Sequence, residues 1–113
     1  MLRLFFFFVL VLSGPVRAAT FTATGDVYRI SALAEELTYD DLLLIDGFSS
    51  AGVCNVATEG MVILRIRDNP KGERQFSMAV AARLAGKQVQ VQVTDSSADS
   101  RGDCYLRWIR LTD

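Results

Sequence analysis

A single helical pattern with strand patterns on both sides of it most constrains the fold of this chain. Within residues 73–85, apolar side chains recur at helical spacing at Phe76, Val80 and Leu84, and a glycine follows where a helix commonly ends. Residues 88–93 then alternate Gln and Val, the period of a strand with one buried face. The sequence therefore predicts one helix, with these three side chains facing the core, in an otherwise β-rich domain.

Further strands are predicted on both sides of this helix. They are residues 27–33, 42–45, 60–67 and 104–111. Residues 20–25 are small and polar, which predicts a flexible lead-in, and Cys104, Leu106 and Trp108 share the predicted buried face of the last strand. Three strands, one helix and two strands is the element order of the OB-fold, a small five-stranded barrel with its helix between strands three and four. A small α+β sheet is the alternative, because element order does not establish barrel closure.

The first eighteen residues have the layout of a secretory signal peptide. A basic start is followed by the apolar run 4–12, and Val16 and Ala18 place small residues before a cleavage site at Ala19. This run is too short to span a bilayer, and the rest of the chain contains no second long apolar run. We expect residues 1–18 to be removed and residues 19–113 to form one secreted or periplasmic domain without a membrane span.

Two cysteines remain in that domain, Cys54 and Cys104. In an oxidising compartment such a pair predicts one disulfide, which suits a domain too small to bury a large core. The alternative is a reactive or metal-binding pair. The chain contains no His and no Cys-x-x-Cys motif, so zinc has almost no ligands to use, and we expect no metal and no cofactor.

The charge of the mature domain argues against nucleic-acid binding. Removal of the leader leaves 10 Lys and Arg against 13 Asp and Glu, a net charge of −3. A domain of this kind has no basic stripe that could replace the counterions on phosphate.

The C-terminal half resembles a known group of proteins. The segments concerned are Phe76-Ser77-Met78-Ala79, Ala81-Ala82, residues 86–91 and Gly102-Asp103-Cys104. They are similar to small secreted bacterial proteins related to the B subunits of AB-type toxins, especially the subtilase-cytotoxin group. The resemblance implies an OB-fold, glycan binding and a pentameric homo-oligomer. We carry over no sugar-contacting position from that group to a residue of this chain.

Two acidic, hydroxyl-rich loops are the predicted ligand site, because the loops after strands one and four lie at the ligand-binding end of an OB-fold. They span residues 35–41 and 95–103. Their carboxylates can accept hydrogen bonds from sugar hydroxyls, and an aromatic ring can stack on a sugar. The predicted ligand-binding residues are Tyr39, Asp40, Asp41, Asp95 and Asp99. Phe48 is a further ring in a turn-rich segment, whereas Trp108 is expected in the core.

Other readings of the same loops are less favoured. An acid pair for glycoside cleavage can be drawn from Glu35, Glu36, Asp40 and Asp41, but loop carboxylates are more often simply solvated. Asp95, Asp99 and Asp103 recur every four residues without the spacing of a calcium loop. Arg101-Gly102-Asp103 matches an adhesion tripeptide, although matches of three residues often arise by chance.

The sequence therefore favours an exported, non-enzymatic binding module for a glycan or a protein. The alternative is a structural or assembly protein of the cell envelope that oligomerises through its barrel edges. A small hydrolase is a third reading with almost no support, because a chain without His cannot build a nucleophile–His pair.

Overall fold

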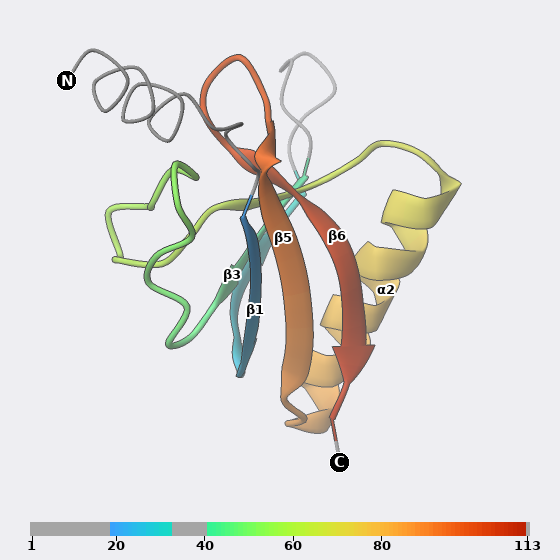
Figure 1. The fold of residues 1–113 in the computed structure, drawn as a ribbon. Helices are drawn as coiled ribbons and strands as arrows, with labels where there is room; N and C mark the ends of the chain where they lie inside the picture. Colours follow the sequence, from blue (N-terminus) through green and yellow to red (C-terminus); the bar gives the residue numbers. More distant parts are fainter. Residues whose placement is uncertain (1–18, 33–40, 113) are drawn as a thin grey trace, which may run out of the picture.

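In the part of the chain that the structure describes, the strands form one twisted sheet with one helix beside it (Figure 1). The computed structural model describes residues 19–32 and 41–112, so the predicted signal peptide (1–18) lies outside the described residues, as do Tyr39 and Asp40. The elements are β1 (Thr20–Gly25), β2 (Val27–Ser31), β3 (Asp41–Ile45), β4 (Leu64–Ile66), α2 (Pro70–Ala85), β5 (Val89–Ala98) and β6 (Cys104–Leu111).

The sheet has six strands in the order β1-β5-β6-β4-β3-β2. Neighbouring strands are antiparallel except for β4 and β6, which are parallel. In the described part of the chain, β1 and β2 form the two edges and do not pair with each other. The predicted mainly-β fold with one helix is confirmed, whereas a closed barrel is not.

The two edge strands are consecutive in the chain, separated by Asp26 alone. The prediction of a flexible lead-in over residues 20–25 is wrong, because these residues pair with β5 along its whole first half. Gly25 lies against the backbone oxygen of Asp46, and a Cβ at Gly25 would overlap that atom. Its lack of a side chain thus lets the chain turn from one edge of the sheet to the other.

Strand β6 contains an irregularity that changes which residues are buried. Gln92 pairs with Trp108 but the next residue, Val93, pairs with Leu106, so Arg107 is an extra residue on β6. Beyond this bulge the alternation shifts by one: Ile109 is buried, and Trp108 is only partly buried. The prediction that Trp108 belongs to the core is therefore wrong, because the bulge shifts the buried positions of β6 by one residue.

The helix is confirmed, but it begins earlier than predicted. Asn69 caps it by accepting a hydrogen bond from the backbone nitrogen of Gly72 at 2.8 Å, and Pro70 occupies the first turn. Gly86 ends the helix in the left-handed conformation, with φ of 67°.

The face of α2 that meets the sheet is not the predicted one. Its buried residues are Gly72, Gln75, Ala79 and Ala82. Leu84 is 83% exposed, so the prediction that it packs into the core is wrong, while Phe76 is partly buried against the core. Small side chains let the helix approach β2, β4 and β6 closely, which a stripe of larger residues would prevent.

The core is built by residues of the sheet, of α2 and of the loop after β3. It includes Leu43, Leu64, Val91 and Leu106, all nearly or fully buried. The predicted disulfide is confirmed: Cys54 of this loop is bonded to Cys104 at the start of β6. The disulfide therefore fixes the β3–β4 loop to the turn that precedes β6.

Candidate functional site

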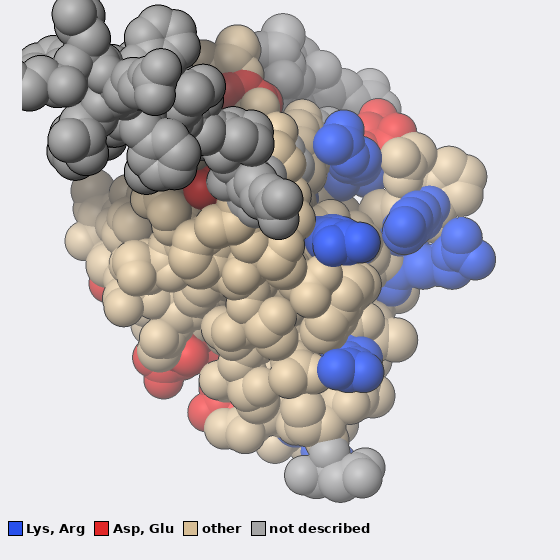
Figure 2. All heavy atoms as spheres, viewed as in Figure 1, with Lys and Arg blue, Asp and Glu red and all other residues tan. Residues whose placement is uncertain are grey.

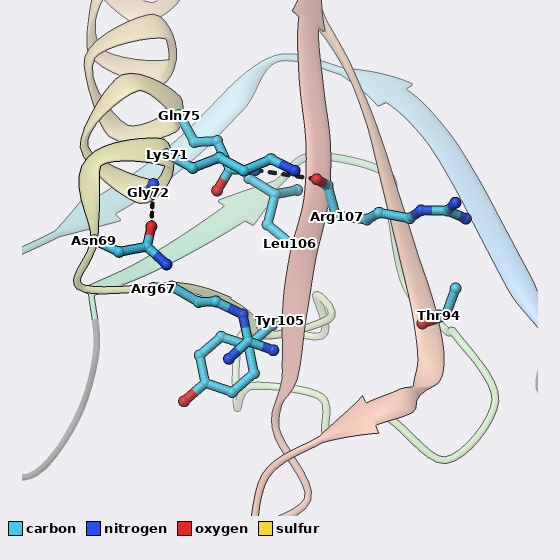
Figure 3. A pocket seen from close by; sticks show the side chains of 9 residues that line it. All are labelled: Arg67, Asn69, Lys71, Gly72, Gln75, Thr94, Tyr105, Leu106 and Arg107. Atoms are coloured by element: carbon cyan, nitrogen blue, oxygen red, sulfur yellow. Dashed lines mark hydrogen bonds between the residues drawn. The ribbon is translucent and has the colours of Figure 1, made fainter.

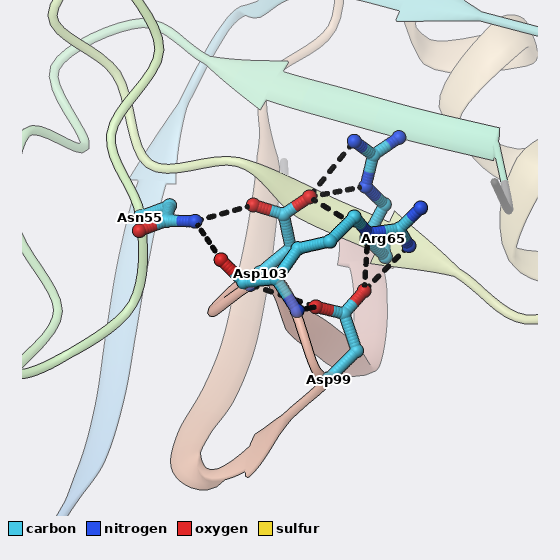
Figure 4. A network of polar contacts seen from close by, with 5 residues as sticks. Asn55, Arg65, Asp99 and Asp103 are labelled. Carbon is cyan, nitrogen blue, oxygen red and sulfur yellow. Dashed lines mark hydrogen bonds and ion pairs between the residues drawn. The ribbon is translucent and has the colours of Figure 1, made fainter.

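The turn between β5 and β6 is held together by Asp99. Its carboxylate accepts hydrogen bonds from the backbone nitrogens of Arg101 and Asp103, at 2.9 and 3.1 Å, and pairs with the Arg101 guanidinium (Figure 4). Desolvation by burial acts to raise the pKa of Asp99, but the hydrogen bonds from Arg101 and Asp103 outweigh it and lower that pKa below its ordinary value of 3.8. Asp99 thus shapes the β5–β6 turn.

Asp103 is the centre of a buried polar network beside the disulfide (Figure 4). One of its oxygens accepts a hydrogen bond from Nε of Arg65 at 2.8 Å and forms an ion pair with Nη2 of the same residue at 2.8 Å. The other oxygen accepts a hydrogen bond from the side chain of Asn55 at 2.9 Å. Asp103 is 4% exposed. The Arg101-Gly102-Asp103 sequence therefore has its carboxylate inside the protein and is not displayed as an adhesion motif.

The remaining predicted acidic residues lie apart from one another. Asp95 belongs to β5 rather than to a loop, and it contacts the backbone of Ala19. Asp41 pairs with Ile66, at the end of β4 that leads to α2, whereas the β5–β6 turn adjoins the opposite end of β4 through the Leu64–Cys104 pair. Among the described residues, Asp41 and Asp99 are therefore not brought together into one site.

A basic cavity lies between the first turn of α2 and strand β6 (Figure 3). Its volume is about 320 Å³. It is lined by Arg67, Asn69, Lys71, Gly72, Gln75, Thr94, Tyr105, Leu106 and Arg107. Three of these residues are cationic and none is acidic, which is unusual for a chain whose formal net charge is −1.

Arg67 and Lys71 form the helix side of this cavity. The Arg67 guanidinium lies over the Tyr105 ring, 3.9 Å from its centroid, and Lys71 points from α2 toward β6 (Figure 3). Gln75 donates a hydrogen bond to the backbone oxygen of Arg107 at 3.2 Å and so ties the helix to the bulge in β6. The Arg107 side chain extends away from α2, on the side where Thr94 lies (Figure 3). Arg67 and Lys71 therefore supply the cationic groups on the helix side, and the Arg107 guanidinium lies apart from them (Figure 3).

The spacing of the cavity walls depends on Gly72. A Cβ at this position would overlap the backbone oxygen of Arg67, so the first turn of α2 can lie this close to the end of β4 only with glycine there. The sequence gives a partial signal for this junction, because Asp68-Asn69-Pro70 is a helix-start pattern between Arg67 and Lys71. The strand predicted over residues 60–67 ends at Arg67 and the helix is predicted only from residue 73, so neither prediction points to Lys71 or to a site at this junction.

A second cavity of about 220 Å³ adjoins the first, since both are lined by Arg67 and Gly72. Its other lining residues are Asp41, Asp68, Glu73, Phe76 and Ser77. Asp41 is thus a predicted ligand residue that the structure places at a cavity.

Charge is distributed unevenly over the surface. Figure 2 shows Lys and Arg side chains gathered over the start of α2 and β6, while most of the visible Asp and Glu side chains lie on the opposite side. Such an arrangement attracts anions to the face that contains the basic cavity.

Two aromatic residues, Phe48 and Trp108, lie in environments other than the predicted ones. Phe48 is 5% exposed and belongs to the core, so the prediction that it is available to a sugar is wrong. Trp108 carries the Arg110 guanidinium over its ring, 4.6 Å from the centroid.

Within residues 19–32 and 41–112, no group of three or more His, Cys, Asp or Glu side chains is placed to hold a metal ion. No helix in the same part of the chain is long and apolar enough to cross a membrane. Comparison of the chain with protein-family models, curated proteins and solved structures finds no significant match.

Proposed function

We propose that this protein is an exported, non-enzymatic binding module that takes a small anionic ligand into the cavity between α2 and β6. The observation that carries the proposal is the lining of this cavity, which includes Arg67, Lys71 and Arg107 but no carboxylate. Its volume of about 320 Å³ falls at the lower end of the range for small-molecule sites.

An acidic saccharide suits the remaining lining of the cavity. Its carboxylate or sulfate would pair with Arg67 and Lys71, because guanidinium and ammonium groups make charge-assisted hydrogen bonds to such anions. Asn69, Gln75 and Thr94 add amide and hydroxyl groups, which suit the hydroxyls of a sugar ring. A glycan thus remains the proposed ligand, but it is an acidic one, and its site is the basic cavity instead of the acidic loops.

The sheet order supports an OB-like architecture for this module. Residues 20–31 contribute β1 at one edge and β2 at the other, so a single bent segment joins both ends of the sheet. Counted as one strand, it gives five strands with the helix between the third and fourth, as in a partly open OB barrel.

Export is supported by two features. The sequence of residues 1–18 has the layout of a signal peptide, and the Cys54–Cys104 disulfide is compatible with an oxidising compartment.

The open edges of the sheet favour a second function, assembly into a homo-oligomer of the envelope. Both β1 and β2 pair on one side only among the described strands, and an edge strand presents backbone groups to another chain. The mass of the native particle tests this alternative, because assembly requires a multimer.

A saccharide array tests the main proposal. Mature protein should bind acidic saccharides at low ionic strength and release them as salt is added, while neutral saccharides of the same size should not bind. Preference for neutral saccharides, or binding that survives removal of both Arg67 and Lys71, would contradict the anionic site.

A further inference from the structure

Asp95 faces one particular backbone nitrogen, that of Ala19. Its Oδ1 accepts a hydrogen bond from this nitrogen at 2.9 Å, and the Asp95 backbone nitrogen donates to the Ala19 carbonyl oxygen at 3.1 Å. These bonds extend the ladder between β1 and β5 beyond its last pair, Thr20 and Thr94. The Asp95 side chain is therefore aligned with the start of the edge strand.

The loop after β3 confines the other side of this carboxylate. Gly52 has φ of +55°, and a Cβ there would overlap Oδ2 of Asp95. The neighbouring residue, Ala51, is buried, so this part of the loop is packed in place. The carboxylate is thus held between the Ala19 nitrogen and the backbone of Gly52.

We propose that removal of residues 1–18 converts this hydrogen bond into an ion pair between the new α-ammonium group of Ala19 and Asp95. The inference rests on the export step of the proposed function, namely cleavage after Ala18. In that step a signal peptidase hydrolyses the Ala18–Ala19 bond: the hydroxyl of water is added to the Ala18 carbonyl carbon, and its hydrogen goes to the Ala19 nitrogen. The resulting amine takes up one further proton from solvent near neutral pH.

This ion pair would make the pairing of β1 with β5 depend on removal of residues 1–18. A hydrogen bond between charged partners is stronger than one to a neutral amide, so the cleaved chain gains an interaction that the precursor lacks. Strand β1 pairs only with β5 among the described strands, and the gain therefore acts on the edge of the sheet.

The pKa of the Ala19 amine in the exported protein tests the proposal. Reductive methylation with ¹³C labels this amine and two lysines, Lys71 and Lys87, and NMR follows the signal of the amine as the pH is changed. The amine should titrate roughly half a pKa unit or more above its value in Asp95→Asn. Asp26→Asn removes a charge at the other end of β1 and serves as the matched control, with no expected change.

Two further measurements distinguish a wrong cleavage site from a missing ion pair. N-terminal sequencing of the exported protein shows whether cleavage occurs before Ala19, and a different terminus would contradict the export step itself. A terminus at Ala19 with the same amine pKa in the native protein and in Asp95→Asn would overturn the ion pair alone. One glycine added before Ala19 moves the ammonium group by roughly 3.5 Å and should abolish the shift.

Discussion

The guanidinium carbon of Arg67 lies 3.9 Å from the centroid of the Tyr105 ring, which ties the segment before α2 to strand β6 across the mouth of the basic cavity. Stacking uses the flat face of the guanidinium and not its N–H edge, so the same contact that orients Arg67 leaves its donors in the plane where a carboxylate binds. Tyr105 therefore supports and orients the Arg67 guanidinium.

Gly72→Ala should destabilise the protein. The new methyl group would overlap the backbone oxygen of Arg67, and the helix must move away from β4 to accommodate it. We expect a loss of roughly 1–3 kcal/mol in the free energy of unfolding, measured by denaturant titration. Ser77→Ala, an exposed change in the same helix, is the control and should have little effect. Equal stability of the two variants would show that the helix start is not packed as described.

Asp103→Ala should be among the most damaging single changes. It leaves the Arg65 guanidinium, whose side chain is 10% exposed, without its carboxylate partner. Breaking a buried ion pair in this way costs roughly 3–5 kcal/mol in the free energy of unfolding. Asp68→Ala removes an exposed carboxylate and serves as the control. A loss below about 1 kcal/mol in Asp103→Ala would mean that water replaces the carboxylate at Arg65.

The paired substitution of Cys54 and Cys104 by Ala should lower the free energy of unfolding by roughly 4 kcal/mol, because the disulfide closes a loop of 50 residues in the unfolded chain. Denaturant titration of the native and substituted proteins measures this difference. Intact mass of the native protein should also be lower by two hydrogens than that of its reduced form. An unchanged transition midpoint after reduction would contradict the account.

Acid should destabilise the β5–β6 turn through Asp99. Its pKa is lowered in the folded state, so the stability that it contributes is fully present above the ordinary pKa of 3.8 and is lost as the pH falls through the lower folded value. Asp99→Asn should therefore flatten the pH dependence of the free energy of unfolding below about pH 3.8. Parallel pH profiles for Asp99→Asn and the native protein would contradict this role.

Local sequence patterns were sufficient to predict much of the fold. The Gln–Val alternation of β5 and the glycine at the end of α2 both act through neighbours in the chain, and both predictions are confirmed. The Cys54–Cys104 pair was predictable because no other cysteine competes for it.

The errors arise where contacts distant in sequence decide the outcome. The helix spacing of Phe76, Val80 and Leu84 is regular, but the close approach of α2 to the sheet selects the small residues Ala79 and Ala82 for the buried face. The β6 bulge at Arg107 reverses the alternation and exposes part of Trp108, which no local pattern indicates.

The candidate site was missed for the same reason. Arg67 and Lys71 are near one another in sequence, but Tyr105 and Arg107 reach them only through the pairing of β4 with β6. The acidic composition of the polar loops led to the prediction of a ligand site there. In the structure, Asp99 and Asp103 use their carboxylates for hydrogen bonds within the protein.

The most direct test of the anionic site is the affinity of the mature protein for glucuronate, measured by calorimetry in Lys71→Ala and Lys87→Ala. Both variants lose one lysine from or next to α2, but only Lys71 lines the basic cavity. We expect Lys71→Ala to weaken binding by about tenfold or more, and Lys87→Ala to leave it unchanged. Equal affinities in the two variants, or no detectable binding of glucuronate by the native protein at low ionic strength, would contradict the proposed site.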